Sequence, residues 1–399
     1  MSAHRFYRIF SASTSGVGAG GRRAGSHFVG GTGAGGRRAG SRRIGWTAAG
    51  VLGLVAAAFA STAPPAAAAT GHLGRPRIVG VYGTTTVDDV SCSPSQYCLV
   101  GGQARDATGD YGFVATINDG TVGSLVNVSG MNSVAAVACP QKGWCLAFGF
   151  GKVVNSEQPD LLAAIVNGKP VKAAVEMGTN LPITGIACES ADACFVVGSI
   201  NGRGLVVPVI DGRTTSPKEY ASGQLLNAIS CPASLNTCVV MGSNPSSSKH
   251  RTAYVVRITG AQPSAVATAI GGISDPTGMA CTAYYSCLVS GIDTTTNQGE
   301  VEDVSHTTAG DIHEVNEPFV YETTCASTTL CATIALTAHG VLGIVPVTGG
   351  QPGAFTAAMP GPGDQTLTGI ACQGSAHCYA VGSDVINRRL EGVVFRFAL

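Results

Sequence analysis

Residues 186–198 read IACESADACFVVG, and this stretch decides the fold. It contains small or apolar residues, a cysteine, a five-residue spacer, a second cysteine, an apolar triplet and a glycine. The phrase occurs seven times, at intervals of 43 to 50 residues, and one copy has a six-residue spacer. A period of this length indicates one structural unit used repeatedly. The seven copies contain all 14 cysteines: Cys92 and Cys98, Cys139 and Cys145, Cys188 and Cys194, Cys231 and Cys238, Cys281 and Cys287, Cys325 and Cys331, and Cys372 and Cys378.

A single repeat has the pattern of four antiparallel strands. In the third copy, apolar or alternating stretches are separated by the turn signals Asn201-Gly202 and Asp211-Gly212. No helical periodicity is present. We expect strands at Ile183–Cys188, Cys194–Gly198, Gly204–Ile210 and, more weakly, Ser216–Ala221. Four such strands in a repeat of about 47 residues form the unit of a β-propeller blade.

Two columns of the repeat predict how the strands are used. The residue before the first cysteine is always small, which suits an innermost strand crowded around an axis: Ser91, Ala138, Ala187, Ser230, Ala280, Thr324 and Ala371. The fourth residue after the second cysteine is glycine in six copies, which indicates a bulge or a close backbone approach: Gly102, Gly149, Gly198, Gly242, Gly291 and Gly382. The sixth copy has Ala335 there, so we expect its blade to be the least regular.

The repeats are expected to close into a ring. Residues 71–399 number 329, which is seven times 47, and the seventh repeat ends after its third strand, Gly392–Phe397. Its fourth strand is expected from Arg77–Tyr82, ahead of the first phrase. We therefore predict an all-β, seven-bladed propeller in which the N-terminal strand completes the last blade and limits exposed sheet edges. The alternatives are two smaller β domains or an open array.

The cysteines of each phrase are expected to form a disulfide with each other. An even number of cysteines in an exported chain indicates disulfides. Metal binding is the rival, but structural zinc sites need four ligands, and each unit offers only two thiols without a matching histidine. Each bond would close a short loop, for which chain entropy predicts roughly 2.4 kcal/mol of stabilisation.

The N-terminal 69 residues differ from the rest of the chain. They hold eight arginines and no Asp, Glu or Lys, followed by an apolar run from Trp46 to Ala60 and the small-residue end Ala66–Ala69. This order predicts an export signal over 1–69, cleaved near Ala69, ahead of the propeller over 70–399. An uncleaved membrane anchor is the alternative. Ser41–Trp46 loosely resembles a twin-arginine motif, but we favour the general secretory route because the disulfides should form outside the cell.

The charge of the propeller region limits its partners. The whole chain has 24 basic and 24 acidic residues, so the region after the eight arginines has 16 basic against 24 acidic residues, a net charge of about −8. This balance argues against nucleic acid or an anionic membrane as the partner. We expect a monomer without a cofactor, secreted or associated with the cell envelope, that meets a membrane only through an uncleaved N-terminal segment.

The expected binding surface lies opposite the disulfides. The loops between the second and third strands are polar and vary in length, and they should gather on that face: Gln103–Tyr111, Lys152–Asp160, Asn244–Thr252 and Asp293–Gly299. Variable polar loops on a rigid scaffold are where binding usually occurs. An unidentified protein or glycan is the expected ligand of this loop face.

The phrase from Ile186 to Gly198, and its copy from Ile370 to Gly382, resembles a repeat of secreted actinobacterial proteins. Those proteins are similar to β-propellers of the sialidase-repeat and photosystem-assembly-factor type. The resemblance covers roughly residues 78–399 and implies a propeller fold without implying an activity. The blades lack a Trp-Asp ending, and the sialidase aspartate box is absent.

Three acids are weak catalytic candidates because we expect them to face the axis. Asp88 and Asp89 precede the first phrase on a predicted inner strand, and Tyr321 and Glu322 hold the equivalent places in the sixth repeat. Carboxylates in such a channel can act as general acids or bases. The alternative is that they only solvate a wet channel.

The densest titratable group lies in the fifth repeat. Glu302, His306 and His313 are weak candidates for a metal site, since histidines among carboxylates suit metal binding or acid–base chemistry. The alternative is a solvated hairpin with alternating charges. Two glycine-rich stretches, Gly16–Gly21 and Gly31–Gly36, match a dinucleotide fingerprint but lie in the export segment without a strand or helix pattern, so no cofactor site is expected.

Two functions follow from these observations. The first is a secreted or envelope-associated propeller that binds a partner and catalyses nothing. The alternative is a propeller glycoside hydrolase or lyase that acts on extracellular polysaccharide through axial carboxylates, which would have to stand within about 5–10 Å of one another.

Overall fold

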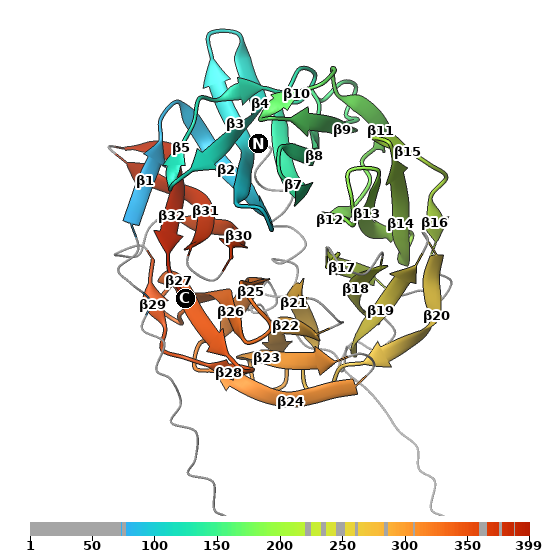
Figure 1. Ribbon diagram of the computed structural model, residues 1–399, viewed down its shortest axis with the longest axis vertical. Helices are drawn as coiled ribbons and strands as arrows, with labels where there is room; N and C mark the ends of the chain where they lie inside the picture. The colour runs from blue at the N-terminus through green and yellow to red at the C-terminus, as the bar shows by residue number, and fades with distance from the viewer. Residues whose placement is uncertain are drawn as a thin grey trace, which may run out of the picture. The chain divides into compact units, whose positions relative to one another are not determined.

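The computed structural model describes Leu73 and residues 77–219, 225–232, 237–244, 252–259, 262–282, 286–305, 308–358, 365–374, 377–386 and 388–399. These residues form seven antiparallel sheets that follow one another around an axis (Figure 1). The predicted seven-bladed propeller is confirmed. None of the described residues forms a helix with the length and apolar character needed to cross a bilayer.

Each blade is one sheet, numbered here in chain order. Blade 1 contains β2 (Thr84–Ser93), β3 (Tyr97–Asp106), β4 (Gly109–Asn118), β5 (Thr121–Val122) and β6 (Val126–Asn127). Blade 2 contains β7 (Ser133–Gln141), β8 (Trp144–Phe150), β9 (Pro159–Val166), β10 (Lys169–Pro170) and β11 (Val175–Thr179). Blade 3 contains β12 (Ile183–Cys188), β13 (Ala193–Ile200), β14 (Arg203–Ile210), β15 (Arg213–Thr214) and β16 (Lys218–Glu219). Blade 4 contains β17 (Leu225–Ser230), β18 (Thr237–Ser243), β19 (Ala253–Thr259) and β20 (Gln262–Ala269).

The remaining three blades complete the ring. Blade 5 contains β21 (Asp275–Cys281), β22 (Ser286–Asp293), β23 (Gln298–Ser305) and β24 (Thr308–Val315). Blade 6 contains β25 (Phe319–Cys325), β26 (Leu330–Leu336), β27 (Leu342–Thr348), β28 (Gln351–Pro352) and β29 (Thr356–Ala357). Blade 7 contains β30 (Thr366–Gln373), β31 (His377–Ile386), β32 (Arg389–Phe397) and β1 (Arg77–Val81). In blades 1, 2, 3 and 6 the fourth position is shared by two short strands that pair with the same third strand.

The N-terminal strand closes the ring as predicted. β1 pairs antiparallel with β32, from Arg77 opposite Arg396 to Val81 opposite Gly392. Blade 7 therefore takes three strands from the C-terminal end of the chain and its outermost strand from the start of the described region (Figure 1). The turns expected in blade 3 are also present, since Asn201-Gly202 and Asp211-Gly212 both have two consecutive positive φ angles, as tight hairpin turns require.

The hydrophobic core is divided among the blade interfaces. Seven clusters of buried apolar side chains are found among the described residues, and each is built from two neighbouring blades. Between blades 5 and 6, for example, Leu288 and Val301 pack with Val345. Each sheet is thus covered by the preceding blade on one face and by the following blade on the other. This explains the nearly continuous apolar runs in the second and third strands.

A bulge recurs in the first strand of every blade. The register between the first and second strands shifts at the same point in each blade. The shift begins at the residue five positions before the first cysteine; in blade 1 it lies between Val87 and Asp89. At this point the first strand lies so close that a Cβ atom on the facing glycine would collide with its backbone; Gly102 faces the Thr86 carbonyl and Gly382 faces the Thr366 carbonyl. The predicted role of the glycine column is therefore confirmed. Blade 6, which has Ala335, differs because its irregularity spans two residues, Tyr321 and Glu322.

The bulged residue links its blade to the next one. The side chain donates a hydrogen bond to the carbonyl that precedes the next bulge at four junctions. The pairs are Thr184 Oγ1 to Leu226 O at 2.8 Å, Asn227 Nδ2 to Pro276 O at 2.9 Å, Thr277 Oγ1 to Val320 O at 2.8 Å and Thr368 Oγ1 to Val87 O at 3.1 Å. These bonds form most of an inner hydrogen-bonded ring around the axis.

The disulfides lie at the far end of the same strand pair. All 14 cysteines are bonded within their own phrase, with Cα–Cα distances of 3.9 to 4.1 Å. The predicted pairing is therefore confirmed. Seven disulfides are compatible with the oxidising surroundings of a secreted or envelope protein.

The bulge predicts the effect of one added methyl group. Gly382→Ala should lower the free energy of unfolding by about 1–3 kcal/mol, because Cβ would overlap the Thr366 carbonyl. Chemical denaturation followed by Trp144 fluorescence measures this. Ala335→Gly at the same column of blade 6 is the matched control and should cost no more than about 1 kcal/mol. Equal stability of Gly382→Ala and the wild type would contradict this account of the bulge.

Each disulfide should contribute a limited amount. Replacing Cys372 and Cys378 together by serine is expected to lower the free energy of unfolding by roughly 2 kcal/mol, since the closed loop is short. The fold should survive, because six other bonds and all seven apolar clusters remain. Non-reducing peptide mapping and denaturation curves test both points, and unfolding of the variant at room temperature would refute the additive picture.

Candidate functional site

The first strands bring three predicted acids together near the axis. Asp88 is the bulged residue of blade 1, where other blades have Thr184, Asn227, Thr277 or Thr368. Asp89 follows it, and Glu322 occupies the same column in blade 6, three residues before the first cysteine. We call Asp88, Asp89 and Glu322 the axial acid group.

The fold does not require a carboxylate in this column. The other five blades have alanine or glycine there: Ala136, Gly185, Ala228, Gly278 and Gly369. A Cβ atom placed on Gly185 or Gly278 would face the first strand of the next blade, so this position points along the ring. Asp89 and Glu322 are therefore additions to a position that otherwise only needs to be small.

Asp89 is held firmly by main-chain groups. Its Oδ1 accepts a hydrogen bond from the Val90 N–H at 2.8 Å, and its Oδ2 accepts one from the Val137 N–H of blade 2 at 2.8 Å. Asp88 is held less tightly, since its Oδ2 accepts a hydrogen bond from the Ser133 hydroxyl at 3.3 Å. Asp89 thus ties blades 1 and 2 together as well as carrying charge.

Glu322 is the free member of the group. It lies on the irregular segment of blade 6, and its carboxylate accepts no hydrogen bond from the described residues, although its main-chain carbonyl accepts one from the Thr333 hydroxyl at 3.2 Å. Solvent reaches the side chain of Glu322, but the protein atoms around it limit its hydration. Blade 7 separates blades 6 and 1, and its Gly369 leaves room: a Cβ there would lie 2.8 Å from Asp89 Oδ1. The charge of Asp89 consequently acts on Glu322 across the ring.

Crowding at the axis changes the protonation of all three acids. Burial raises the pKa of Asp88 from 3.8 to about 6, while hydrogen bonds from Thr86 and Ser133 oppose the rise. Burial raises the pKa of Asp89 to about 7, against the effect of its two amide partners and with a small addition from Asp88. Burial, followed by the charge of Asp89, raises the pKa of Glu322 from 4.5 to about 8. The group therefore shares protons at neutral pH instead of carrying three full charges.

No basic side chain offsets these acids on the first strands. The seven inner strands β2, β7, β12, β17, β21, β25 and β30 contain no Lys, Arg or His. Asp275, at the start of β21, is their one further acid. An unoffset acidic centre of this kind is suited to a positively charged or hydrogen-bond-donating ligand.

Two of the three predicted metal candidates of blade 5, Glu302 and His313, lie on opposite faces of the sheet. His306 lies outside the described residues. His313 is opposite Val301 and contacts Gln351 of blade 6 at 2.8 Å, whereas Glu302 is opposite Ile312, on the other face of the sheet. Within the described part of the chain, no three His, Cys, Asp or Glu side chains are arranged to hold a metal ion.

Glu302 is instead buried beside a second acid. Burial raises its pKa from 4.5 to about 7, which the nearby Gly271 N–H partly offsets and the charge of Glu300 reinforces. Burial also raises the pKa of Glu300, helped by Asp293 and Glu314. Sequence reasoning grouped Glu302 with the histidines because it could not tell which face of the strand each side chain occupies.

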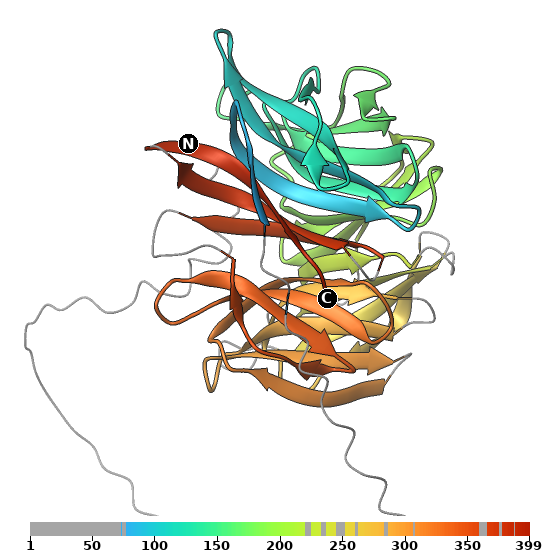
Figure 2. The same cartoon turned by 60° about the vertical axis from the view of Figure 1, so that its left-hand side comes forward.

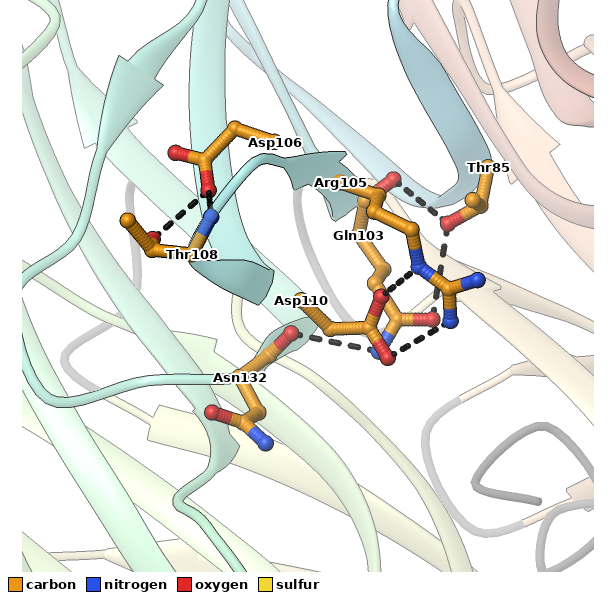
Figure 3. Close-up of polar contacts among 7 residues, drawn as sticks. All are labelled: Thr85, Gln103, Arg105, Asp106, Thr108, Asp110 and Asn132. Atoms are coloured by element: carbon orange, nitrogen blue, oxygen red, sulfur yellow. Dashed lines mark hydrogen bonds and ion pairs between the residues drawn. The ribbon is translucent and has the colours of Figure 1, made fainter.

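One predicted binding loop is largely regular structure. The expected loop Gln103–Tyr111 is a hairpin, because β3 continues to Asp106 and β4 begins at Gly109. It projects beyond its neighbours (Figure 2). An Arg105–Asp110 ion pair and an Asp106–Thr108 hydrogen bond stiffen it, and Gln103 reaches the Asn132 carbonyl of the next link (Figure 3). The strand pattern was hidden by the glycines and charges near the turn.

The other predicted loops differ in length. Residues 151–158 of blade 2 form a loop with one bridge between Val154 and Glu157, and residues 294–297 of blade 5 form a short turn. The predicted loop Asn244–Thr252 of blade 4 lies mostly outside the described residues. Because strands alternate in direction, these connections lie at the opposite ends of the strands from the disulfides.

The comparisons with known proteins support the architecture alone. No protein-family model and no curated protein sequence matches the chain. Hydrazine synthase from Kuenenia stuttgartiensis is similar in structure, with a TM-score of 0.53 and 12% identity over 79% of this chain and 96% of that one. A YCF48 bound to a D1 peptide has a TM-score of 0.50 and 9% identity over 82% of this chain and 96% of that one. At such identities the likeness shows a shared propeller fold.

The raised pKa values predict that this protein is more stable in mild acid. Asp88, Asp89 and Glu322 have pKa values of about 6, 7 and 8 in the folded state, so they keep protons there that the unfolded chain releases near pH 4. The free energy of unfolding should therefore fall as pH rises from about 5 to about 8. Denaturation at several pH values measures this slope.

Glu322→Gln should make that slope shallower at the alkaline end of the range, since it removes the group with the highest of the three pKa values. Asp311→Asn, an exposed acid on β24, is the control and should leave the slope unchanged. A stability that rises from pH 5 to pH 8 would overturn this description of the acids.

Proposed function

We propose that this protein is a non-catalytic binding propeller of the cell exterior or envelope. Its ligand is a protein or glycan held on the face opposite the disulfides, with the axial acid group at the centre of the contact. The observation that carries the proposal is the presence of Asp89 and Glu322 in a column where five blades need only alanine or glycine.

The charges of these acids are not balanced by the fold. Their raised pKa values mean that the ring favours their neutral forms, and no basic side chain on the inner strands compensates them. Perturbed, uncompensated titratable groups of this kind gather at functional sites. A ligand that brings a positive charge or several hydrogen-bond donors would supply what the protein itself lacks.

The loop face supports the same interpretation. The stiff hairpin around Arg105 and Asp110 and the longer loop at 151–158 provide walls of different height on a rigid ring. A YCF48 of similar fold is bound to a D1 peptide, which supports a peptide as one ligand class for a propeller of this kind. We infer that the ligand class here is a cationic peptide segment or an amino- or hydroxyl-rich glycan.

Binding is favoured over catalysis because Asp89 is already engaged. Both of its oxygens accept main-chain hydrogen bonds at 2.8 Å, which hold the carboxylate against blades 1 and 2 and limit its movement toward a substrate. Glu322 is then the only unrestrained carboxylate of the group. A glycoside hydrolase needs two carboxylates that work on opposite sides of the bond.

A ligand screen tests the proposal. The purified secreted protein should retain a component from envelope polysaccharides or from a panel of lysine- and arginine-rich peptides, and Glu322→Gln should weaken that binding by about tenfold, or about 1.4 kcal/mol. Asp311→Asn is the matched control and should bind like the wild type. A uniformly negative screen, or equal binding by Glu322→Gln, would refute the proposal.

The alternative, a glycoside hydrolase or lyase, is favoured by one observation. Asp89 and Glu322 interact, and their pKa values of about 7 and 8 suit proton transfer near neutral pH. Release of reducing ends from extracellular polysaccharides, lost in Glu322→Gln but kept in Asp311→Asn, would establish this activity. We expect no turnover.

A further inference from the structure

Two buried glutamates meet at the interface between blades 4 and 5. Glu300 and Glu302 alternate with Val301 on β23, so both side chains leave the same face of the sheet. Val304, which shares this face, packs with Met241 and Val255 of blade 4. The two carboxylates therefore point toward blade 4, away from the contact that His313 makes with blade 6.

Three of the four carboxylate oxygens have no well-formed hydrogen bond from the described residues. Glu302 is 1% exposed and Glu300 is 7% exposed. Neither oxygen of Glu302 accepts a hydrogen bond of good geometry, and Oε2 of Glu300 accepts none either. Buried polar atoms are nearly always paired in proteins, so three unpaired oxygens within one strand face require an explanation.

Among the described residues, no basic side chain offsets the charge of these two acids. The side chains whose charges act on Glu300 and Glu302 are acids, Asp293 and Glu314, besides the two glutamates themselves. Two unpaired buried carboxylates are strongly unfavourable unless a cation or a proton neutralises them. The described side chains therefore leave the negative charge of this cluster without a positive partner.

The backbone comes close to these oxygens on the blade 4 side. The link from β20 to β21 passes Gly271 and Gly272, and a Cβ on Gly272 would lie 3.2 Å from Glu300 Oε2. Gly272 also has a φ of 73°, which favours glycine. The chain thus brings main-chain groups next to the acids at a point where a side chain would block the approach.

We propose that Glu300 and Glu302 bind a calcium ion at the interface between blades 4 and 5. The ion meets the two carboxylates with an equal and opposite charge and supplies the partner that their oxygens lack. Main-chain carbonyl and water oxygens complete the coordination, because within the described residues no third acid, histidine or cysteine side chain is arranged for it.

The donor set selects calcium over other metals. The described side chains at this position offer only oxygen ligands, whereas zinc and copper prefer nitrogen and sulfur donors. Calcium accepts six to eight oxygens in variable geometry, including carbonyls and water, whereas magnesium demands a regular octahedron. A bound ion would cross-link blade 5 to the link that leaves blade 4.

Calcium titration of the full secreted protein, after treatment with a chelator, tests the site. Isothermal titration should show one ion per chain, and calcium should raise the melting temperature of the wild type by several degrees. Asp311→Asn, the exposed acid on the neighbouring strand, should respond equally. Glu302→Gln should lose the calcium response while its metal-free form melts no lower than the metal-free wild type, because it buries no charge.

Three results would overturn the proposal. The first is an absence of calcium binding to the wild type, in which case protonation alone neutralises the pair. The second is a calcium response that persists in both Glu302→Gln and Glu300→Gln. The third is loss of the response in Glu322→Gln but not in Glu302→Gln, which would assign the ion to the axial acid group. Glu300→Gln keeps the test decisive if Glu302→Gln does not fold.

Discussion

The close approach of the first strand to the second, at the bulge, is the constraint on which this ring depends. A carbonyl of the inner strand stands where the facing residue would have its Cβ, so that residue is glycine in six blades. The same bulge turns Thr184, Asn227, Thr277 and Thr368 toward the next blade, where each donates to a main-chain carbonyl. One distortion therefore packs a blade internally and attaches it to its neighbour, and the disulfide fixes the register of the same two strands.

Most of this architecture could be predicted because each blade carries the same local requirements. The cysteine spacing, the small residue before Cys188 and the glycine after Cys194 are properties of a single repeat, and they are visible without knowledge of the ring. The sequence predicts a loop at the hairpin of Arg105 and Asp110, because the cross-strand ion pair becomes apparent only when the two strands are paired. Which face of β23 carries Glu302 was equally inaccessible, since a bulge or a register shift of one residue reverses it.

The sequence predicts the three members of the axial acid group, but it does not predict that Asp89 and Glu322 interact. Asp89 and Glu322 are far apart in the chain and belong to blades that are not neighbours. They interact because the ring closes and brings blades 6, 7 and 1 together, with Gly369 of blade 7 next to Asp89. These conditions are properties of three blades at once, which no single repeat can reveal.

The two acidic sites differ in how their negative charge is stabilised, and this difference separates their roles. Glu322 is exposed, so water hydrates it partly and a proton or a visiting ligand can reach it and leave. Glu302 is 1% exposed, so an ion at its carboxylate is shielded from solvent by the two blades. Reversible binding therefore belongs at the axis. A permanent structural ion belongs between the blades, where removing it would loosen the scaffold that holds the axial acids in place.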